Sequence, residues 1–246
     1  MTALPTRFPT ARRLRGVRRM AMVVLVGVTG LVLSACTADI HPGSAAVVDG
    51  TSISESRINT LVTAGCAYET AMGKIDPQTY PVLSISTLRA NFVNVLIRNQ
   101  LARDAAAKIG GLRVSQDQVT KFAAGNTIPP DLAEPEKSQI TDFFKESAET
   151  DLLVALIGAH LKDDTVTDAS NVQQADLDAG QKYLTTYAKN AEVSVSPSLG
   201  TWNGTSLQPG SGSLSVLAVT PTTPEAIPGQ PAANPATTLP PSQQCG

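Results

Sequence analysis

The chain has 246 residues, of which 42% are hydrophobic and only 4% aromatic, with 19 basic and 21 acidic side chains. Six arginines and no acidic residue fall within residues 1–35, so the remainder carries 19 − 6 = 13 basic and 21 acidic groups, a net charge of −8. This balance argues against nucleic acid and anionic lipid head groups as partners, because few cations remain to neutralise phosphates. About 185 residues, from 36 to roughly 220, are left to fold, which suits one domain with a sizeable core.

The N-terminal stretch has the layout of an export signal. An uncharged apolar run of about 13 residues, 21–33, follows the arginines and is shorter than the roughly 20 residues that a membrane-spanning helix needs. It ends in Leu33-Ser34-Ala35-Cys36, which resembles the lipobox of a bacterial lipoprotein signal peptide. The resemblance implies that residues 1–35 are removed and that Cys36 carries a diacylglyceryl thioether and an acylated amine. The alternative is a weak transmembrane anchor with a chance cysteine.

A lipidated Cys36 would place the protein on the extracytoplasmic side of the cell membrane, with residues 36–44 as a short spacer. Cys66 and Cys245 then remain as an even pair in a compartment that permits oxidation. They are expected either to form a disulfide or to stay as two thiols, with Cys66 as a small core residue.

Apolar periodicity predicts a mainly α domain over residues 45–220, with four to five helices and a minor two-stranded β element. A short strand at 45–50 closes in an Asp-Gly turn, and capping residues precede several of the helical patterns. The expected helices cover residues 52–72, 84–109, 115–125, 134–161 and 171–190. Further strands are expected at 193–195 and 214–219. Residues 221–246 are rich in Pro, Thr, Ala and Gly, so they are expected to be disordered.

Three segments carry a resemblance to a known family. Residues 45–58 read Ala-Ala-Val-Val-Asp-Gly-Thr-Ser-Ile-Ser-Glu-Ser-Arg-Ile, residues 98–102 read Arg-Asn-Gln-Leu-Ala, and residues 197–202 read Pro-Ser-Leu-Gly-Thr-Trp. With the layout of the helices, they resemble the SurA-type N-terminal chaperone domain, and a group of actinobacterial lipoproteins that carry this domain alone. The resemblance covers about residues 45–205. It implies a helical domain whose first strand pairs with residues 193–195 and whose helices hold unfolded exported polypeptides.

No catalytic pattern is present in the sequence. The two histidines, His41 and His160, are too far apart to suggest a triad or a metal cluster, and the usual hydrolase, zinc-protease and phosphate-binding motifs are missing. Members of the SurA family often carry a parvulin-type isomerase module, but the polar loop 162–171 is too short to hold one. We therefore expect no enzyme activity, no prolyl isomerisation, no cofactor, no metal and no small-molecule substrate.

Two functions follow as expectations. The first is a membrane-anchored, ATP-independent chaperone or foldase-like binder of exported polypeptides, which needs an exposed apolar patch larger than about 400 Å². The alternative is a structural or adaptor lipoprotein that holds one specific folded partner through a smaller, flatter surface. An enzyme or solute-binding protein would need a deep polar pocket, which the sequence does not indicate.

Overall fold

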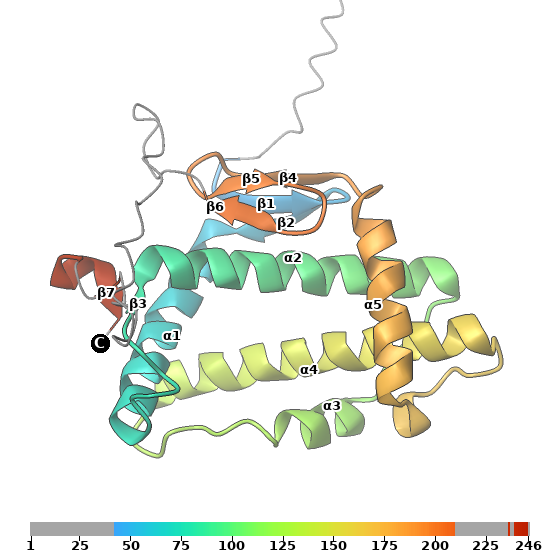
Figure 1. Ribbon diagram of the computed structural model, residues 1–246, viewed down its shortest axis with the longest axis horizontal. Coiled ribbons are helices and arrows are strands. Elements are labelled where there is room, and N and C mark those ends of the chain that lie inside the picture. The colour runs from blue at the N-terminus through green and yellow to red at the C-terminus, as the bar shows by residue number, and fades with distance from the viewer. Residues whose placement is uncertain (1–41, 210–235, 237–238, 246) are drawn as a thin grey trace, which may run out of the picture. The chain divides into compact units, whose positions relative to one another are not determined.

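The structure is a computed structural model that describes residues 42–209, 236 and 239–245 (Figure 1). The described residues form one compact unit. The described part is mainly helical, with five α-helices and three small antiparallel sheets. The expected signal peptide 1–35, the lipidation site Cys36 and the expected strand at 214–219 lie outside the described residues.

The described helices are α1 (Glu55–Ile75), α2 (Ile85–Ile109), α3 (Gln116–Ala123), α4 (Glu134–Lys162) and α5 (Gln174–Ala188). Those expected from residues 84, 115 and 134 begin within one residue of these positions. Those expected from residues 52 and 171 begin three residues late, because residues 51–54 form a strand and residues 169–171 a 3₁₀ turn. Ser54 and Ser84 accept hydrogen bonds from backbone N–H groups in the first turns of α1 and α2, and Ser115 forms a capping box with Gln118. The prediction that α1 ends near Met72 is wrong by about one turn, because no proline interrupts the chain before Pro77.

The main sheet joins the two ends of the domain. Its central strand β1 (Ser44–Val48) lies between β2 (Thr51–Ser54) and β4 (Val193–Val195), with Val48 opposite Val193. This pairing confirms the expected contact between the first strand and residues 193–195. The prediction of a two-stranded element is wrong, because the chain reverses at Asp49-Gly50, where both φ angles are positive, and adds β2 before α1 begins.

The core lies where α1, α2, α4 and the sheet meet. The sheet packs against α2, while α2 and α4 lie side by side and α5 crosses both (Figure 1). Fully buried aliphatic side chains fill the centre: Val48, Ile58, Ile97, Leu156 and Ile157. A smaller apolar cluster around Tyr68 and Ile140 connects α1 to the start of α4. The buried faces of the helices and of the main sheet therefore meet in one main apolar interior, with the smaller cluster beside it.

Two glycines allow α4 and α5 to cross closely. A Cβ atom at Gly158 would lie 1.9 Å from the carbonyl oxygen of Asp176, and one at Gly180 would lie 1.8 Å from that of Val154. No side chain fits at either distance, so backbone packs on backbone here. This contact fixes the position of α5.

The end of the chain is tied to α1. Cys66 and Cys245 form a disulfide that closes a sequence separation of 179 residues. Next to it, β7 (Gln244–Cys245) pairs with β3 (Leu83–Ser84), after a single 3₁₀ turn, η3 (Pro241–Gln243). The prediction of disorder is therefore wrong for residues 239–245, because the disulfide and the strand pairing supply contacts that composition does not reveal.

Candidate functional site

A β-hairpin builds one wall of the candidate site. Strands β5 (Gly200–Trp202) and β6 (Leu207–Pro209) are joined by a turn in which the side-chain oxygen of Asn203 accepts from the backbone N–H groups of Thr205 and Ser206. This hairpin has no counterpart among the strands expected from the sequence. The Asn203-Gly204 dipeptide was the available signal, since Gly204 takes the positive φ that such turns favour.

The hairpin is fixed to α2 by a polar contact and by an apolar one. The backbone N–H of Leu207 donates to the side-chain oxygen of Asn94 over 2.6 Å, and the Leu207 side chain is buried in the main core. Asn94 therefore holds the edge of β6 against the helix. Trp202, on the neighbouring strand, is thereby held beside α5.

A pocket of about 230 Å³ lies in the corner where α2, α5 and the hairpin meet, named here the α2–α5 pocket. Its apolar walls come from all three elements: Val95, Leu101, Leu184, Ala188 and Trp202. Polar side chains lie among the lining as well: Asn94, Arg98, Gln181, Thr185, Thr205 and Ser206. The pocket is therefore largely apolar, with hydrogen-bonding groups available to a ligand.

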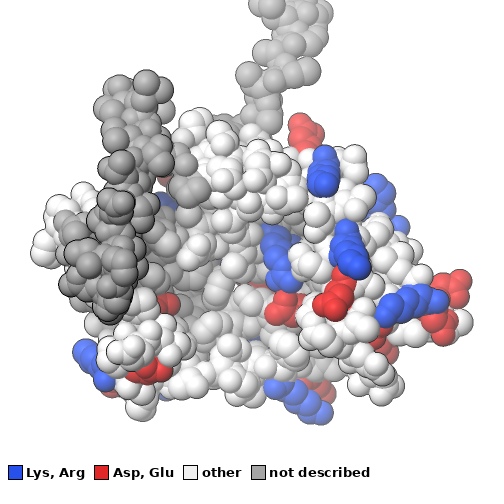
Figure 2. Space-filling model, in the orientation of Figure 1, with Lys and Arg blue, Asp and Glu red and all other residues white. Residues whose placement is uncertain are grey.

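Arg98 is positioned by its neighbours. Its guanidinium donates to Asp151 of α4 over 2.9 Å and to Gln181 of α5 over 3.3 Å. Charged side chains gather on the right of the face in Figure 2, over α5 and the nearby helix ends, while few lie over its centre. The fixed cation beside the pocket can attract a carbonyl or carboxylate oxygen of a ligand.

Trp202 contributes an unusual group to this corner. Its indole nitrogen is buried and has no hydrogen-bond partner within the described part of the chain. Leaving such a donor unpaired costs about 1–3 kcal/mol. An acceptor brought close by a ligand, with a small shift of the ring, would recover part of that cost.

Large exposed apolar side chains are few in the described residues. Ile75, Phe122 and Leu161 are between 50% and 60% exposed. They lie on three different helices, and the ends of α1 and α4 that carry two of them are on opposite sides of the domain (Figure 1). These three side chains do not make a single broad apolar surface.

Of the residues named from the sequence, Cys66 and Cys245 come together in the disulfide. Cys245 also lines a second pocket. His160, in the last turn of α4, donates from Nδ1 to the carbonyl oxygen of Val166 over 2.9 Å, so it braces the following loop. No group of three His, Cys, Asp or Glu side chains among the described residues could hold a metal ion. His41 and Cys36 fall outside the described residues.

Comparisons with protein-family models, with curated proteins and with solved structures found no match to this chain. Among the helices in the described ranges, none combines the length and apolar character that crossing a membrane requires.

Proposed function

We propose that this protein is a lipid-anchored, ATP-independent binder of exported polypeptides. The observation that carries the proposal is the α2–α5 pocket, an apolar hollow of about 230 Å³ with a positioned arginine at its side. In this role the pocket takes the place of the broad exposed patch expected from the sequence: it receives one large apolar side chain from an extended segment, while Arg98 and Gln181 bind its backbone carbonyl groups. The resemblance of residues 45–205 to the SurA-type chaperone domain supports the same role.

The expected energy of such a contact fits transient binding. Burying one large apolar side chain contributes about 1.5–3 kcal/mol, and a few hydrogen bonds add about 1 kcal/mol each. Those gains are partly offset by the entropy lost when an extended chain is immobilised. Weak contacts of this kind suit many different unfolded chains better than one tight partner.

A second candidate function is an adaptor that holds one folded partner. The three exposed large hydrophobic residues, separated on three helices, favour this reading over a broad chaperone surface. An adaptor would form one stoichiometric complex and would not protect unrelated unfolded proteins.

An aggregation assay distinguishes these functions. The lipid-free compact unit, from residue 37 onward, should suppress aggregation of several unrelated unfolded proteins at near-equimolar ratio. Thr185→Phe, which places a ring in the α2–α5 pocket, should remove most of this protection. Lys182→Phe, on the exposed side of the same helix, is the matched control and should retain it.

Two outcomes would contradict the proposal. Protection of no unfolded protein, combined with isolation of one stoichiometric complex, would favour the adaptor. Equal protection by the Thr185→Phe variant would move polypeptide binding away from this pocket.

We also propose that the anchor is lipid on Cys36, as the lipobox resemblance implies. Cys36→Ala should leave the precursor unprocessed or release the protein from the membrane fraction. Unchanged mass and unchanged membrane retention of the variant would refute the lipid anchor without bearing on the α2–α5 pocket.

A further inference from the structure

A second hollow of about 310 Å³ lies on the opposite flank of the domain, beside the disulfide. Its walls are formed by residues 69–74 of α1, by residues 77–82 of the connection to α2 and by Cys245. We name it the α1–Cys245 groove. It shares no lining residue with the α2–α5 pocket.

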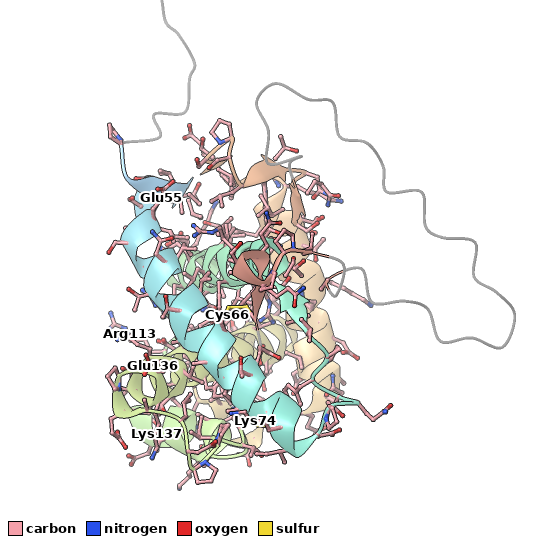
Figure 3. All side chains as sticks on the ribbon, turned by 90° about the vertical axis from the view of Figure 1, so that its left-hand side faces the viewer. Glu55, Cys66, Lys74, Arg113, Glu136 and Lys137 are labelled. Atoms are coloured by element: carbon pink, nitrogen blue, oxygen red, sulfur yellow. A yellow bond between two sulfur atoms is a disulfide. The ribbon has the colours of Figure 1, made fainter. Side chains whose placement is uncertain are left out.

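The disulfide supplies one wall of this groove. Cys245 is 3% exposed, and its Cα atom lies 4.7 Å from that of Cys66. Figure 3 shows Cys66 near the middle of α1, facing the C-terminal segment, with Lys74 at the far end of the helix. The two-residue pairing of β7 with β3 also holds this wall against the domain. The shape of the groove therefore depends on the disulfide between Cys66 and Cys245.

Glu69 is the unusual residue of the α1–Cys245 groove. Its side chain is partly buried, and within the described part of the chain it forms no ion pair and accepts no hydrogen bond. Burial raises the pKa of Glu69 above its ordinary value, and the described residues supply no compensating charge. A desolvated carboxylate without a partner is stabilised strongly by an incoming cation.

Lys74 does not satisfy this carboxylate. It lines the same groove but is exposed, and it lies five residues further along α1, which turns it about 140° around the helix from Glu69. A metal ion is a poor candidate, because calcium and magnesium need several oxygen ligands and Glu69 supplies one carboxylate. The remaining walls, from Pro77, Tyr80 and Pro81, are suited to an organic cation with an apolar stem.

We propose that the α1–Cys245 groove binds an arginine or lysine side chain of a polypeptide, with Glu69 as its counter-ion. The aliphatic stem of the ligand packs against the prolines and Tyr80, and its charged head reaches the carboxylate. The acidic balance of residues 36–246, −8, favours the approach of basic segments. The groove shares no residue with the α2–α5 pocket, so the proposal for one site can be refuted while the proposal for the other stands.

The test uses the oxidised compact unit and two short blocked peptides, Ac-Ala-Arg-Ala-NH₂ and the same peptide with uncharged citrulline for arginine. Backbone amide shifts in a heteronuclear NMR titration should move around residues 69–82 and Cys245 with the arginine peptide, and much less with the citrulline peptide. Glu69→Gln should weaken arginine binding by about tenfold or more. Glu55→Gln, at the start of the same helix, should leave it unchanged.

Cys245→Ser gives a second arm, because loss of the disulfide removes one wall and should also weaken binding. Urea denaturation checks that the Glu69→Gln variant folds, and removal of a desolvated charge should not lower its stability. Equal binding of the two peptides, or unchanged binding by folded Glu69→Gln protein, would overturn the proposal.

Discussion

Asn99 and Thr150 form the one side-chain hydrogen bond that lies wholly within the described core. The hydroxyl of Thr150 on α4 donates to the side-chain oxygen of Asn99 on α2 over 2.8 Å, and both residues are completely buried. The amide nitrogen of Asn99 has no partner among the described residues. This hydrogen bond fixes the register of α2 against α4, and the unpaired amide nitrogen of Asn99 lowers the stability that the pair contributes.

Thr150→Val should therefore lower the free energy of unfolding by about 1–3 kcal/mol, because the amide oxygen of Asn99 loses its buried donor. The double variant Asn99→Leu/Thr150→Val should be closer to the wild type, since both partners become apolar. Urea denaturation of the three proteins measures the difference. Additive losses in the double variant would show that the pair is not energetically coupled.

Asp104 is half-buried, and its charge makes it sensitive to pH. One carboxyl oxygen accepts from Gln100 over 2.9 Å, while the other is buried and has no partner in the described ranges. Burial, and then the nearby Asp49, raise the pKa of Asp104 above its ordinary value. The stabilisation associated with this raised pKa is present below the ordinary value and is lost as pH rises through the folded-state value.

Asp104→Asn removes that dependence. Relative to the wild type, the variant should gain stability as the pH is raised from about 3 to 7, because the wild type must then bury a charge. Denaturation curves at several pH values provide the measurement. A stability difference that stays constant across this window would contradict the assigned desolvation.

At the scale of elements, the crossing of α4 and α5 determines the shape of the α2–α5 pocket. The pocket takes four lining residues from α5, and this helix is held against α4 by the backbone contact at Gly158 and Gly180. Any substitution that separates the two helices should therefore also change the pocket.

Gly180→Ala should destabilise the domain at or above the upper end of the ~1–3 kcal/mol typical of overpacking, because its Cβ would meet backbone rather than a movable side chain. The variant should also bind polypeptide more weakly. Thermal or urea unfolding measures the loss, with Lys182→Ala on exposed α5 surface as the control. Equal stability of the two variants would mean that α5 can shift without cost.

The sequence was most informative about helices, because their signals are local. The helices expected over residues 84–109 and 115–125 begin within one residue of α2 and α3, and α2 ends at Ile109 as expected. It was least informative about pairings between distant segments. A two-residue strand is too short to show apolar alternation, so the pairing of Leu83 with Cys245 could not be predicted from the sequence. The hairpin at Trp202 lies in a short polar stretch that has no strand pattern of its own. The α2–α5 pocket could not be predicted, since it depends on where α5 and the hairpin meet.

At the scale of the whole molecule, the disulfide closes a covalent loop that contains most of the domain. Cys66 lies on the first helix and Cys245 on the last strand, with a separation of 179 residues between them. A loop of this length loses much conformational entropy when it is closed in the unfolded state. The bond also holds one wall of the α1–Cys245 groove.

Replacing both cysteines, as Cys66→Ala/Cys245→Ala, should lower the free energy of unfolding by up to about 5 kcal/mol, the chain-entropy limit for such a loop. The midpoint of urea denaturation for the variant should match that of the reduced wild type. A variant as stable as the oxidised protein would show that the disulfide contributes little to the fold.

Fluorescence from Trp202 tests the central claim most directly, because it is the only tryptophan in the chain and forms a wall of the α2–α5 pocket. Titration with a permanently unfolded, tryptophan-free polypeptide should give a saturable change in its emission. The change should be lost in Thr185→Phe and kept in Lys182→Phe. An emission spectrum that does not respond, or that responds equally in Thr185→Phe, would contradict polypeptide binding at this pocket.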